Sequence, residues 1–512
     1  MRDSLGGKAP VMGFREYQLM SALMLRPARL VLTASISFLP LTVDPAVVES
    51  QNTGTAIDRF MSRAAAYGQF NGAILVVDDG RVVYERAFGL ANMELNAPNR
   101  TTTRFEIASM TKPMTAIAIM QLVQEGRVRL DGTVSDYLPW YPSESGRRIT
   151  VEQLLNHTSG IRQDIAFDDP SPGAEVLAAI NADLLSNDSL VKLIAQRPLR
   201  FEPGTGYGYS SDAYAVLGAI VEHVTGKPYW QALRERVLNR AGMTETGVSY
   251  VRSLVPHRAV GYAQSFDGYT SAPHIGVTPA GGLYSTLRDL YRFDRALYGD
   301  TLVNEQSKAV LFAVRSVITA YGWKTGEDTL PNGARRRVLR TTGGLPGFQA
   351  LMVRVPEARR TIILLSNART LVWRFDDFAV AIGRILDRRT YSMPKRSAAE
   401  VIAAAVNEGR AAAAIAREFD AMSADTARFA VSEAEFNRLG YFFLSRGATA
   451  RAVDVFALNV RAFPRSANVY DSLGEAQLAR GDTTLAIASY RRSLELDPGN
   501  SNALNILKRI AP

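Results

Sequence analysis

Phe105-Glu-Ile-Ala-Ser-Met-Thr-Lys-Pro-Met-Thr-Ala116 is the stretch of sequence that decides the fold. Ser109 and Lys112 stand three residues apart where a helix is predicted to begin, so hydroxyl and amine share one helix face. A lysine buried at that place can lose its proton and activate the serine as a nucleophile. The same spacing occurs at two other places, Ser189/Lys192 and Ser392/Lys395. The surrounding sequence must therefore decide between the three pairs.

Context favours the pair Ser109/Lys112. The residues Met114 to Val123 are apolar on nearly every face, which predicts a buried central helix that stops at Gly126. The second pair leads into Gln-Arg-Pro and the third contains Pro394, so both are interpreted as solvated coincidences.

Strand-like segments stand at both ends of the region around this helix. The run Gly72–Tyr84 predicts a hairpin that turns at Asp79-Gly80. The runs Phe348–Val355 and Thr361–Leu365, with a turn between them, predict an antiparallel pair. Helices are expected between these ends. The pattern predicts an α+β domain, an antiparallel sheet flanked by helices, whose terminal strands share the sheet.

Two loops between the ends of this domain are punctuated by glycine. Leu154-Leu-Asn-His-Thr-Ser-Gly160 predicts a helix that ends at Gly160. A glycine-rich loop that begins at Phe201 leads into a predicted helix, Ala213–Val224. This loop carries Tyr209 to the beginning of that helix.

Composition excludes several classes of site. The 512 residues are 47% hydrophobic and 21% charged, which is ordinary for a soluble globular protein of more than one domain. Cysteine is absent, which excludes disulfides and thiolate chemistry, and the four histidines show no metal-ligand spacing. We expect neither a metal nor a cofactor. The net charge of +9 comes without a dense basic run interleaved with aromatics, so no nucleic-acid partner is expected.

The N-terminal segment is typical of an exported protein. Arg26 and Arg29 precede an apolar run, Leu30 to Val43, which is short for a membrane-spanning helix and contains Pro40. We expect a leader and signal segment over residues 1–45 and a periplasmic or cell-envelope location. An uncleaved membrane anchor and a buried N-terminal helix are the alternatives. Any membrane association is expected through this segment.

A repeat follows the change of composition near Tyr391. Small residues, aromatic residues and a proline recur after 34 residues, which is the period of tetratricopeptide repeats. The matched positions are Leu439, Gly440, Leu444, Gly447, Ala452, Phe456 and Pro464, followed by Leu473, Gly474, Leu478, Gly481, Ala486, Tyr490 and Pro498. Two repeats bury little core, so Ala398–Met422 and Asn502–Ile510 are expected to flank them as helices. We predict a domain at 50–390, a helical linker at 391–430 and the repeats at 431–512.

Five motifs together resemble the class C β-lactamase-related serine hydrolases, which include β-lactamases, D-alanyl-D-alanine carboxypeptidases, D-aminopeptidases and esterases. The resemblance covers roughly Thr53 to Leu386. The first motif is the Ser109 stretch and the second is the His157 loop. The others are Pro203-Gly-Thr-Gly-Tyr-Gly-Tyr-Ser210, Ala280-Gly-Gly-Leu-Tyr-Ser-Thr286 and Thr341-Thr-Gly-Gly-Leu-Pro-Gly-Phe348. It implies a β-lactamase/transpeptidase-like fold with an additional helical subdomain.

The resemblance also implies roles for individual residues. Ser109 would be the nucleophile that forms an acyl-enzyme, and Lys112 would share its proton. Tyr209 would be the general base and later the general acid. The backbone N–H groups of Ser109 and Gly344 would form the oxyanion hole. His157, Ser285 and Thr286 are expected to shape the structure rather than take part in the reaction.

Two substrate-binding positions depart from the family pattern. Ser211 stands where the family has an asparagine, so a hydroxyl with a shorter reach replaces an amide. Thr341, followed by Thr342 and Gly343, stands where the family has lysine or histidine, so a charge-assisted anchor for a substrate carboxylate is missing from this strand. A neutral ester or amide is therefore the substrate that the sequence favours.

Three functions from different classes remain open. The first is an exported serine hydrolase that acts on a small molecule or peptide. The second is a sensor that binds a cell-envelope ligand in the same pocket with little turnover. The third is a scaffold defined by the repeats, against which the intact Ser109, Lys112 and Tyr209 argue. The repeats would dock onto the catalytic domain or bind a protein partner.

Overall fold

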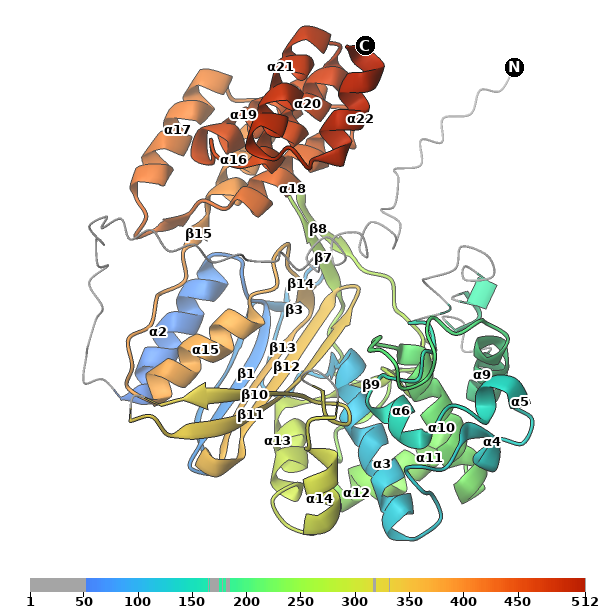
Figure 1. Ribbon diagram of the computed structural model, residues 1–512. Coiled ribbons are helices and arrows are strands. Elements are labelled where there is room, and N and C mark those ends of the chain that lie inside the picture. Colours follow the sequence, from blue (N-terminus) through green and yellow to red (C-terminus); the bar gives the residue numbers. More distant parts are fainter. Residues whose placement is uncertain are drawn as a thin grey trace, which may run out of the picture.

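The computed structural model describes residues 52–163, 165, 175–176, 178–180, 185–315, 319–330 and 332–511. The expected signal segment lies outside these ranges. Among the helices of the described part, none is long and apolar enough to cross a membrane. The ribbon divides into a larger unit built around a sheet and a smaller helical unit at the C-terminus (Figure 1).

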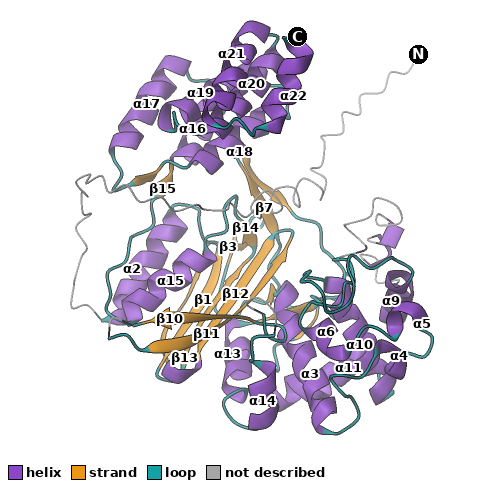
Figure 2. Ribbon diagram, viewed as in Figure 1, coloured by secondary structure: helices purple, strands orange, loops and turns teal. Residues whose placement is uncertain are grey.

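One six-stranded antiparallel sheet forms the centre of the larger unit (Figure 2). In spatial order, its strands are β10 (Lys324–Thr329), β11 (Arg335–Leu345), β12 (Phe348–Val355), β13 (Arg360–Ser366), β1 (Gly72–Asp78) and β2 (Arg81–Phe88). The pairing of β1 with β13 joins the two ends of the domain. Asp79 and Gly80, with φ of 48° and 71°, form the turn between β1 and β2. The expected shared sheet and hairpin are therefore confirmed.

Two helices that are distant in the sequence cover one face of the sheet. α2 (Thr53–Ala66) and α15 (Phe375–Leu386) lie side by side there, and Phe60 packs edge-to-face on Phe378. Alternate strand residues such as Ile74 and Leu364 point into this layer and are fully buried. The terminal regions of the domain thus close one core.

A helical subdomain covers the other face. α13 (Leu287–Ala296) lies against β1 and β13, and α3 (Lys112–Gln124) runs through the middle of the helices. Eleven residues of α3 are buried, which confirms the expected central helix. Gly126, with φ of 68°, follows its last turn. Among the described residues, the other α-helices of this subdomain are α4 (Val134–Tyr137), α5 (Ser143–Gly146), α6 (Val151–Leu155), α9 (Asn187–Ala195), α10 (Ser211–Thr225), α11 (Tyr229–Leu233), α12 (Asn239–Ala241) and α14 (Glu305–Leu311).

Short strands connect the layers. One small sheet contains β7 (Tyr262–Ser265), which pairs with β8 (Gly268–Ser271) as a hairpin and with β14 (Ala368–Arg369) in parallel. Another small sheet joins β5 (Phe105–Glu106) to β9 (Leu283–Ser285) and places the strand before Ser109. The other short strands are β3 (Leu90–Asn92), β4 (Ala97–Pro98), β6 (Gly247–Val248), β15 (Arg396–Ser397) and β16 (Phe429–Ala430).

The C-terminal unit is helical and its elements recur at a fixed interval. Its helices are α16 (Ala398–Asn407), α17 (Ala412–Ala424), α18 (Glu433–Leu444), α19 (Thr449–Ala462), α20 (Ala467–Arg480), α21 (Thr483–Leu496) and α22 (Ser501–Ile510). α18, α20 and α22 begin at residues 433, 467 and 501, which are 34 residues apart, and α19 and α21 begin at 449 and 483, again 34 apart. A Cβ at Gly440 would clash with the ring of Phe456, so glycine lets the paired helices touch.

The β7–β8 hairpin reaches from the larger unit into the helical unit (Figure 2). Phe266 at its tip packs edge-to-face on Phe442 of α18, with ring centroids 5.5 Å apart. Asn407 donates a hydrogen bond to the Phe266 carbonyl oxygen, at 3.0 Å. Arg374, which precedes α15, forms an ion pair of 2.7 Å with Glu435. These contacts attach the helical unit to the sheet-containing unit.

Candidate active site

Ser109 lies in a tight turn that leads into α3. Residues Ala108–Thr111 form a short 3-10 helix, and the Met110 N–H donates to the Ile107 carbonyl oxygen at 3.0 Å. Ala108 has φ of 47°, a left-handed conformation that is unfavourable for a residue with a Cβ. The strained residue immediately before Ser109 turns the chain from β5 into the helix and leaves the serine half-buried.

Lys112 is buried and its amine reaches three oxygen atoms. Its Nζ donates to Ser109 Oγ at 3.0 Å and to the Ala280 carbonyl oxygen at 2.9 Å, and reaches Ser211 Oγ at 3.4 Å. Because an amine at this position has oxygen partners on three sides, its place is fixed despite a flexible side chain. Only 2% of Lys112 is exposed. The prediction that Ser109 and Lys112 lie on one face is confirmed.

Tyr209 approaches Ser109 from the loop before α10. The Tyr209 hydroxyl donates to Ser109 Oγ at 2.9 Å. Ser210 caps α10, because its Oγ accepts the Ala213 N–H at 2.9 Å and donates to the Arg162 carbonyl oxygen at 2.7 Å. The cap fixes the end of the glycine-rich loop and thereby the position of the tyrosine.

His157 contacts the loop that carries Tyr209. Its Nδ1 accepts the Ser210 N–H at 3.2 Å, and its ring lies 4.6 Å from the ring of Tyr209. Burial, with smaller contributions from Lys112 and Lys324, lowers the pKa of His157 from its ordinary 6.5 to about 3. The imidazole is therefore neutral at pH 7 and acts as an acceptor at Nδ1.

The helix before His157 is shorter than the sequence predicts. The predicted end at Gly160 is wrong, because α6 stops at Leu155. His157 itself has φ of 63°, which breaks the helix and turns its ring toward Tyr209. The tertiary contact with the loop overrides the local helical pattern.

Strand β11 forms a wall beside the turn that carries Ser109. The pairing of β10 with β11 ends where Lys324 lies opposite Arg340. The segment Thr341–Leu345 of β11 therefore extends beyond the end of β10. Leu345 and Phe348 flank the two-residue turn to β12, and Gly344 is opposite Gln349. Along two antiparallel strands, facing residues alternate between hydrogen-bonded and non-hydrogen-bonded pairs. Gly344 and Gln349 form a pair of the second kind, so the Gly344 N–H points away from β12 and toward the open edge.

Glycines allow this wall to approach the nucleophile. A Cβ at Gly343 would clash with the Ile107 carbonyl oxygen, and one at Gly281 would lie 3.3 Å from the Ala108 carbonyl carbon. The backbones of β11 and of the loop before β9 are thus in close contact with the Ser109 turn. Thr341 is buried, Thr342 is partly buried and Gly344 is exposed.

The structure brings together most of the predicted residues and adds one group. Ser109, Lys112, Tyr209 and Ser211 share hydrogen bonds, and Gly343 packs beside them. The added group is the Ala280 carbonyl oxygen, which the sequence did not predict because a backbone carbonyl is present in every residue. In the sequence, only the adjacent glycines indicate the turn to which it belongs. Ser285 bonds to Thr246 and Thr286 caps α13, which agrees with their expected structural roles.

The other Ser-x-x-Lys pairs have ordinary surroundings. Lys192 forms an ion pair of 2.7 Å with Asp188 on the surface of α9. Lys395 is partly exposed, and its carbonyl oxygen accepts a hydrogen bond of 2.6 Å from Gln69.

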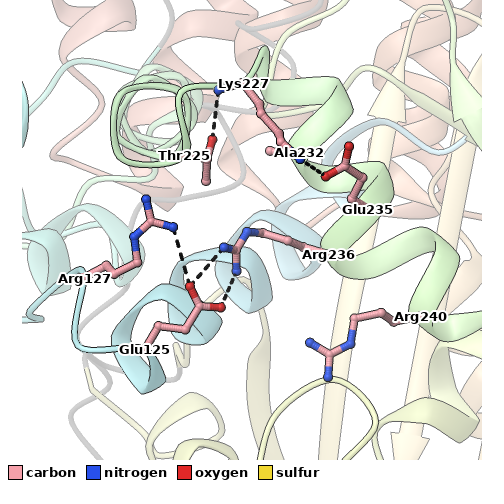
Figure 3. Close-up of a pocket in the computed structure, with 8 residues that line it drawn as sticks. All are labelled: Glu125, Arg127, Thr225, Lys227, Ala232, Glu235, Arg236 and Arg240. Atoms are coloured by element: carbon pink, nitrogen blue, oxygen red, sulfur yellow. Dashed lines mark hydrogen bonds and ion pairs between the residues drawn. The ribbon is translucent and has the colours of Figure 1, made fainter.

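A separate pocket of about 370 Å³ lies at the far end of α3 (Figure 3). Arg236 and Glu125 form ion pairs of 2.7 and 3.0 Å there, and Lys227 pairs with Glu235. Since α3 has 13 residues at about 1.5 Å each, this pocket is about 20 Å from Ser109. It is not part of the candidate site. Over the described ranges, no group of three or more histidine or acidic side chains could hold a metal ion.

The arrangement has the groups that acyl transfer requires. A hydroxyl is in contact with an amine and a phenol, and two backbone N–H groups, those of Ser109 and Gly344, belong to segments that meet at the Ser109 turn. Such a set can move a proton from the hydroxyl and stabilise negative charge on a carbonyl oxygen.

Comparisons with known proteins agree with this geometry. The Beta-lactamase family model matches residues 57–383. Penicillin-binding protein 4* of Bacillus subtilis is 30% identical over 355 residues, 64% of this chain and 75% of its own. The crystal structure of a penicillin binding protein from Bacillus halodurans, 26% identical, superposes with a TM-score of 0.55 over 64% of this chain and 98% of its own. A D-stereospecific amidohydrolase from Streptomyces sp., 27% identical, gives 0.50 over 62% and 94%. The chain belongs to the beta-lactamase and penicillin-binding-protein-like family of serine hydrolases.

Proposed function

We propose that this protein hydrolyses an ester or amide through an acyl intermediate on Ser109. The observation that carries the proposal is the position of Ser109 Oγ, 3.0 Å from Lys112 Nζ and 2.9 Å from the Tyr209 hydroxyl oxygen. Both distances are within reach for direct proton transfer. The lysine of the Ser189/Lys192 pair is instead paired with Asp188.

In the acylation step, the Ser109 proton passes to the Lys112–Tyr209 pair as Oγ attacks the carbonyl carbon of the substrate. The carbonyl π bond opens, and its electron pair moves onto the oxygen. The N–H groups of Ser109 and Gly344 donate to this oxyanion. Lys112 is held by Ala280 and Ser211 during the transfer, so the pair does not reorganise.

The intermediate then collapses. The carbonyl π bond re-forms, the bond to the leaving group breaks, and Tyr209 returns the proton to the leaving oxygen or nitrogen. In the second half, water takes the place of the leaving group and gives its proton to the same pair. After its attack the bond between the acyl carbon and Oγ breaks, the pair returns the proton to Oγ, and the acid leaves with Ser109 restored. His157, neutral and bonded to the Ser210 N–H, keeps the tyrosine loop in place.

Membership of this family indicates that the substrate is an acyl compound, but it does not identify which one. The amidohydrolase neighbour and the penicillin-binding relatives support acyl transfer at an amide or strained amide. Ser211 provides a hydroxyl that reaches Lys112, and the uncharged Thr341 stands at the motif position on β11 where a cation would anchor a carboxylate. An ester or amide, which includes the amide of a D-amino acid, is the proposed class.

We further infer that the protein is exported and that residues 431–512 form tetratricopeptide repeats after a domain at 50–390. The 34-residue spacing of helix starts and the glycines at helix contacts support the repeat class. The apolar run after Arg29 supports export. In this arrangement the helical unit is fixed to the hydrolase through Phe266.

A substrate panel tests the proposed activity. The panel contains a chromogenic β-lactam, a D-Ala-D-Ala peptide, a D-amino acid amide and a short-chain ester. We expect the full chain to hydrolyse at least one of them and the Ser109→Ala variant to hydrolyse none. Labelling of Ser109 without turnover of any substrate would favour the sensor function. Absence of both labelling and turnover would contradict the proposal.

A further inference from the structure

We propose that Arg369 binds an anionic group of the substrate, a carboxylate, and so determines its specificity. This deepens the proposed hydrolase function and rests on it. Thr341 puts no cation at this motif position of β11, so the sequence alone favours a neutral substrate, and the neighbouring Arg340 is paired with Asp376 of α15. In the folded chain a cation reaches the same strand from another element. The guanidinium Nη1 of Arg369 lies 3.6 Å from the position that a Cβ of Gly344 would occupy.

The position of Gly344 makes this contact relevant to the reaction. Gly344 is exposed on the open edge of β11, and its neighbour Gly343 packs against Ile107, two residues before the nucleophile. Successive Cα atoms are about 3.8 Å apart. The guanidinium therefore lies beside the residue whose N–H is proposed to bind the oxyanion. An acyl compound held by that N–H has its substituents within reach of Arg369.

Glycine at position 344 allows the guanidinium to lie directly on the strand. A Cβ at this position would lie 3.6 Å from the guanidinium, which is ordinary van der Waals contact. A side chain larger than that of alanine would therefore occupy the space that the guanidinium fills. The guanidinium has five N–H donors in a planar fork. A contact with the protein therefore leaves donors for the two oxygens of a carboxylate, for which this fork is suited.

The backbone of Arg369 is held in place by its neighbours. Ala368 and Arg369 form β14, which pairs in parallel with Tyr262 and Ala263 of β7. The Leu371 N–H donates to Gln264 Oε1 at 3.2 Å, just beyond the arginine. Because the segment is anchored at and after residue 369, the backbone that carries the guanidinium has a defined position before a substrate arrives, which reduces the entropy lost on binding.

Paired substrates test the proposal in the full chain. Each pair consists of two phenyl esters, one with a carboxylate and one with a neutral carboxamide in its place. In the first pair this group is on the phenolic leaving group, and in the second pair it is on the acyl part. The readout is the ratio of kcat/KM for the charged ester to that for the neutral ester, so a general loss of activity cancels. We expect the ratio for one of the pairs to fall about 10- to 100-fold in Arg369→Gln. Arg369→Lys, which keeps the charge but not the fork, should lie between.

Arg240 provides the matched control. It is an exposed arginine at the pocket of Figure 3, at the far end of α3, and Arg240→Gln removes the same charge from the molecule. Its charged-to-neutral ratio should equal that of the wild type. An unchanged ratio for both pairs in Arg369→Gln would overturn the proposal. Failure of the wild type to hydrolyse any of the four esters or any substrate of the panel above would instead overturn the hydrolase function on which it rests.

Salt dependence gives a second test if Arg369→Gln does not fold. In the wild-type protein, kcat/KM for the preferred charged ester should fall as sodium chloride rises from 0.05 to about 0.5 M, while that for its neutral partner stays constant. Equal salt dependence of the two esters would contradict recognition by a cation.

Discussion

The Tyr209 hydroxyl lies 2.9 Å from Ser109 Oγ, although the two residues are 100 positions apart in the chain. The contact depends on the tyrosine loop, which ends at Ser210, the N-cap of α10, and which His157 supports. Replacement of the hydroxyl alone removes the proton shuttle and keeps the ring. We expect Tyr209→Phe to slow acylation about 10²- to 10⁴-fold, measured by stopped-flow release of a phenol from an activated ester.

Tyr207 is the control for this substitution. It belongs to the same loop, is 40% exposed, and its ring lies 6.2 Å from that of His157. Tyr207→Phe should acylate at nearly the wild-type rate. An equal loss in both variants would mean that the loop needs tyrosines for packing and would contradict a proton transfer through Tyr209.

Gly343 tests whether close contact of β11 with the nucleophile turn is needed. A Cβ there would clash with the Ile107 carbonyl oxygen, which is backbone and cannot rotate away. We expect Gly343→Ala to displace the strand and lower kcat at least about tenfold, because the oxyanion donor on Gly344 moves with it. The steady-state rate with an activated ester measures the effect.

The matched control is Gly383 on α15, where a Cβ meets nothing within 4 Å. Gly383→Ala should keep full activity and raise the stability by about 0.5–1 kcal/mol, since alanine favours the helix. Full activity in Gly343→Ala would show that the strand does not contribute to the reaction.

His157 should make the protein less stable in acid. Its pKa is lowered from 6.5 to about 3 in the folded state, mainly by burial, so the unfolded chain binds a proton that the folded chain rejects. The free energy of unfolding therefore loses up to about 1.4 kcal/mol per pH unit as the pH falls from 6.5 toward 3. Urea unfolding of the wild type and of His157→Gln at several pH values isolates this contribution.

The variant should be less stable than the wild type at pH 7 and lose less stability on acidification. His223→Gln, at an exposed position of α10, should keep the wild-type pH dependence. Parallel curves for the wild type and His157→Gln would rule out His157 as the titrating group.

Phe266 should hold the helical unit to the larger unit. Its ring lies 5.5 Å from that of Phe442, and its carbonyl oxygen accepts the hydrogen bond from Asn407. We expect Phe266→Ala to lower the stability of the junction by about 1–3 kcal/mol, because the aromatic contact and part of the buried area are lost. Faster cleavage near residues 391–397 in limited proteolysis would report it.

Leu254 serves as the control, because it is an apolar loop residue that is fully exposed. Leu254→Ala should be cleaved at the wild-type rate. If Phe266→Ala is cleaved no faster than Leu254→Ala, the hairpin does not attach the helical unit.

Local patterns were sufficient for much of the fold. The turn at Asp79-Gly80, the buried helix α3 and the 34-residue spacing each depend on residues that are close together in the chain or recur in it. The shared sheet followed from strands at both ends of the domain. The end of α6 could not be predicted in this way, since His157 leaves the helix to support a loop about 50 residues later.

The candidate site likewise contains groups that could be predicted from the sequence and groups that only the fold brings together. Side chains with characteristic chemistry, such as Ser109, Lys112 and Tyr209, could be found in the sequence. The Ala280 carbonyl oxygen could not, because every residue has one and only the fold selects it. Arg369 is one arginine among many in a basic chain, and its contact with Gly344 arises from the pairing of β14 with β7.

The most direct measurement for the central claim is the mass of the protein after reaction with a fluorophosphonate or a penicillin. We predict one covalent adduct per chain, located by peptide mapping on Ser109, and none in Ser109→Ala. Lys112 and Tyr209 should be unmodified. An adduct on another residue, or an adduct that persists unchanged in Ser109→Ala, would contradict the assignment of Ser109 as the nucleophile.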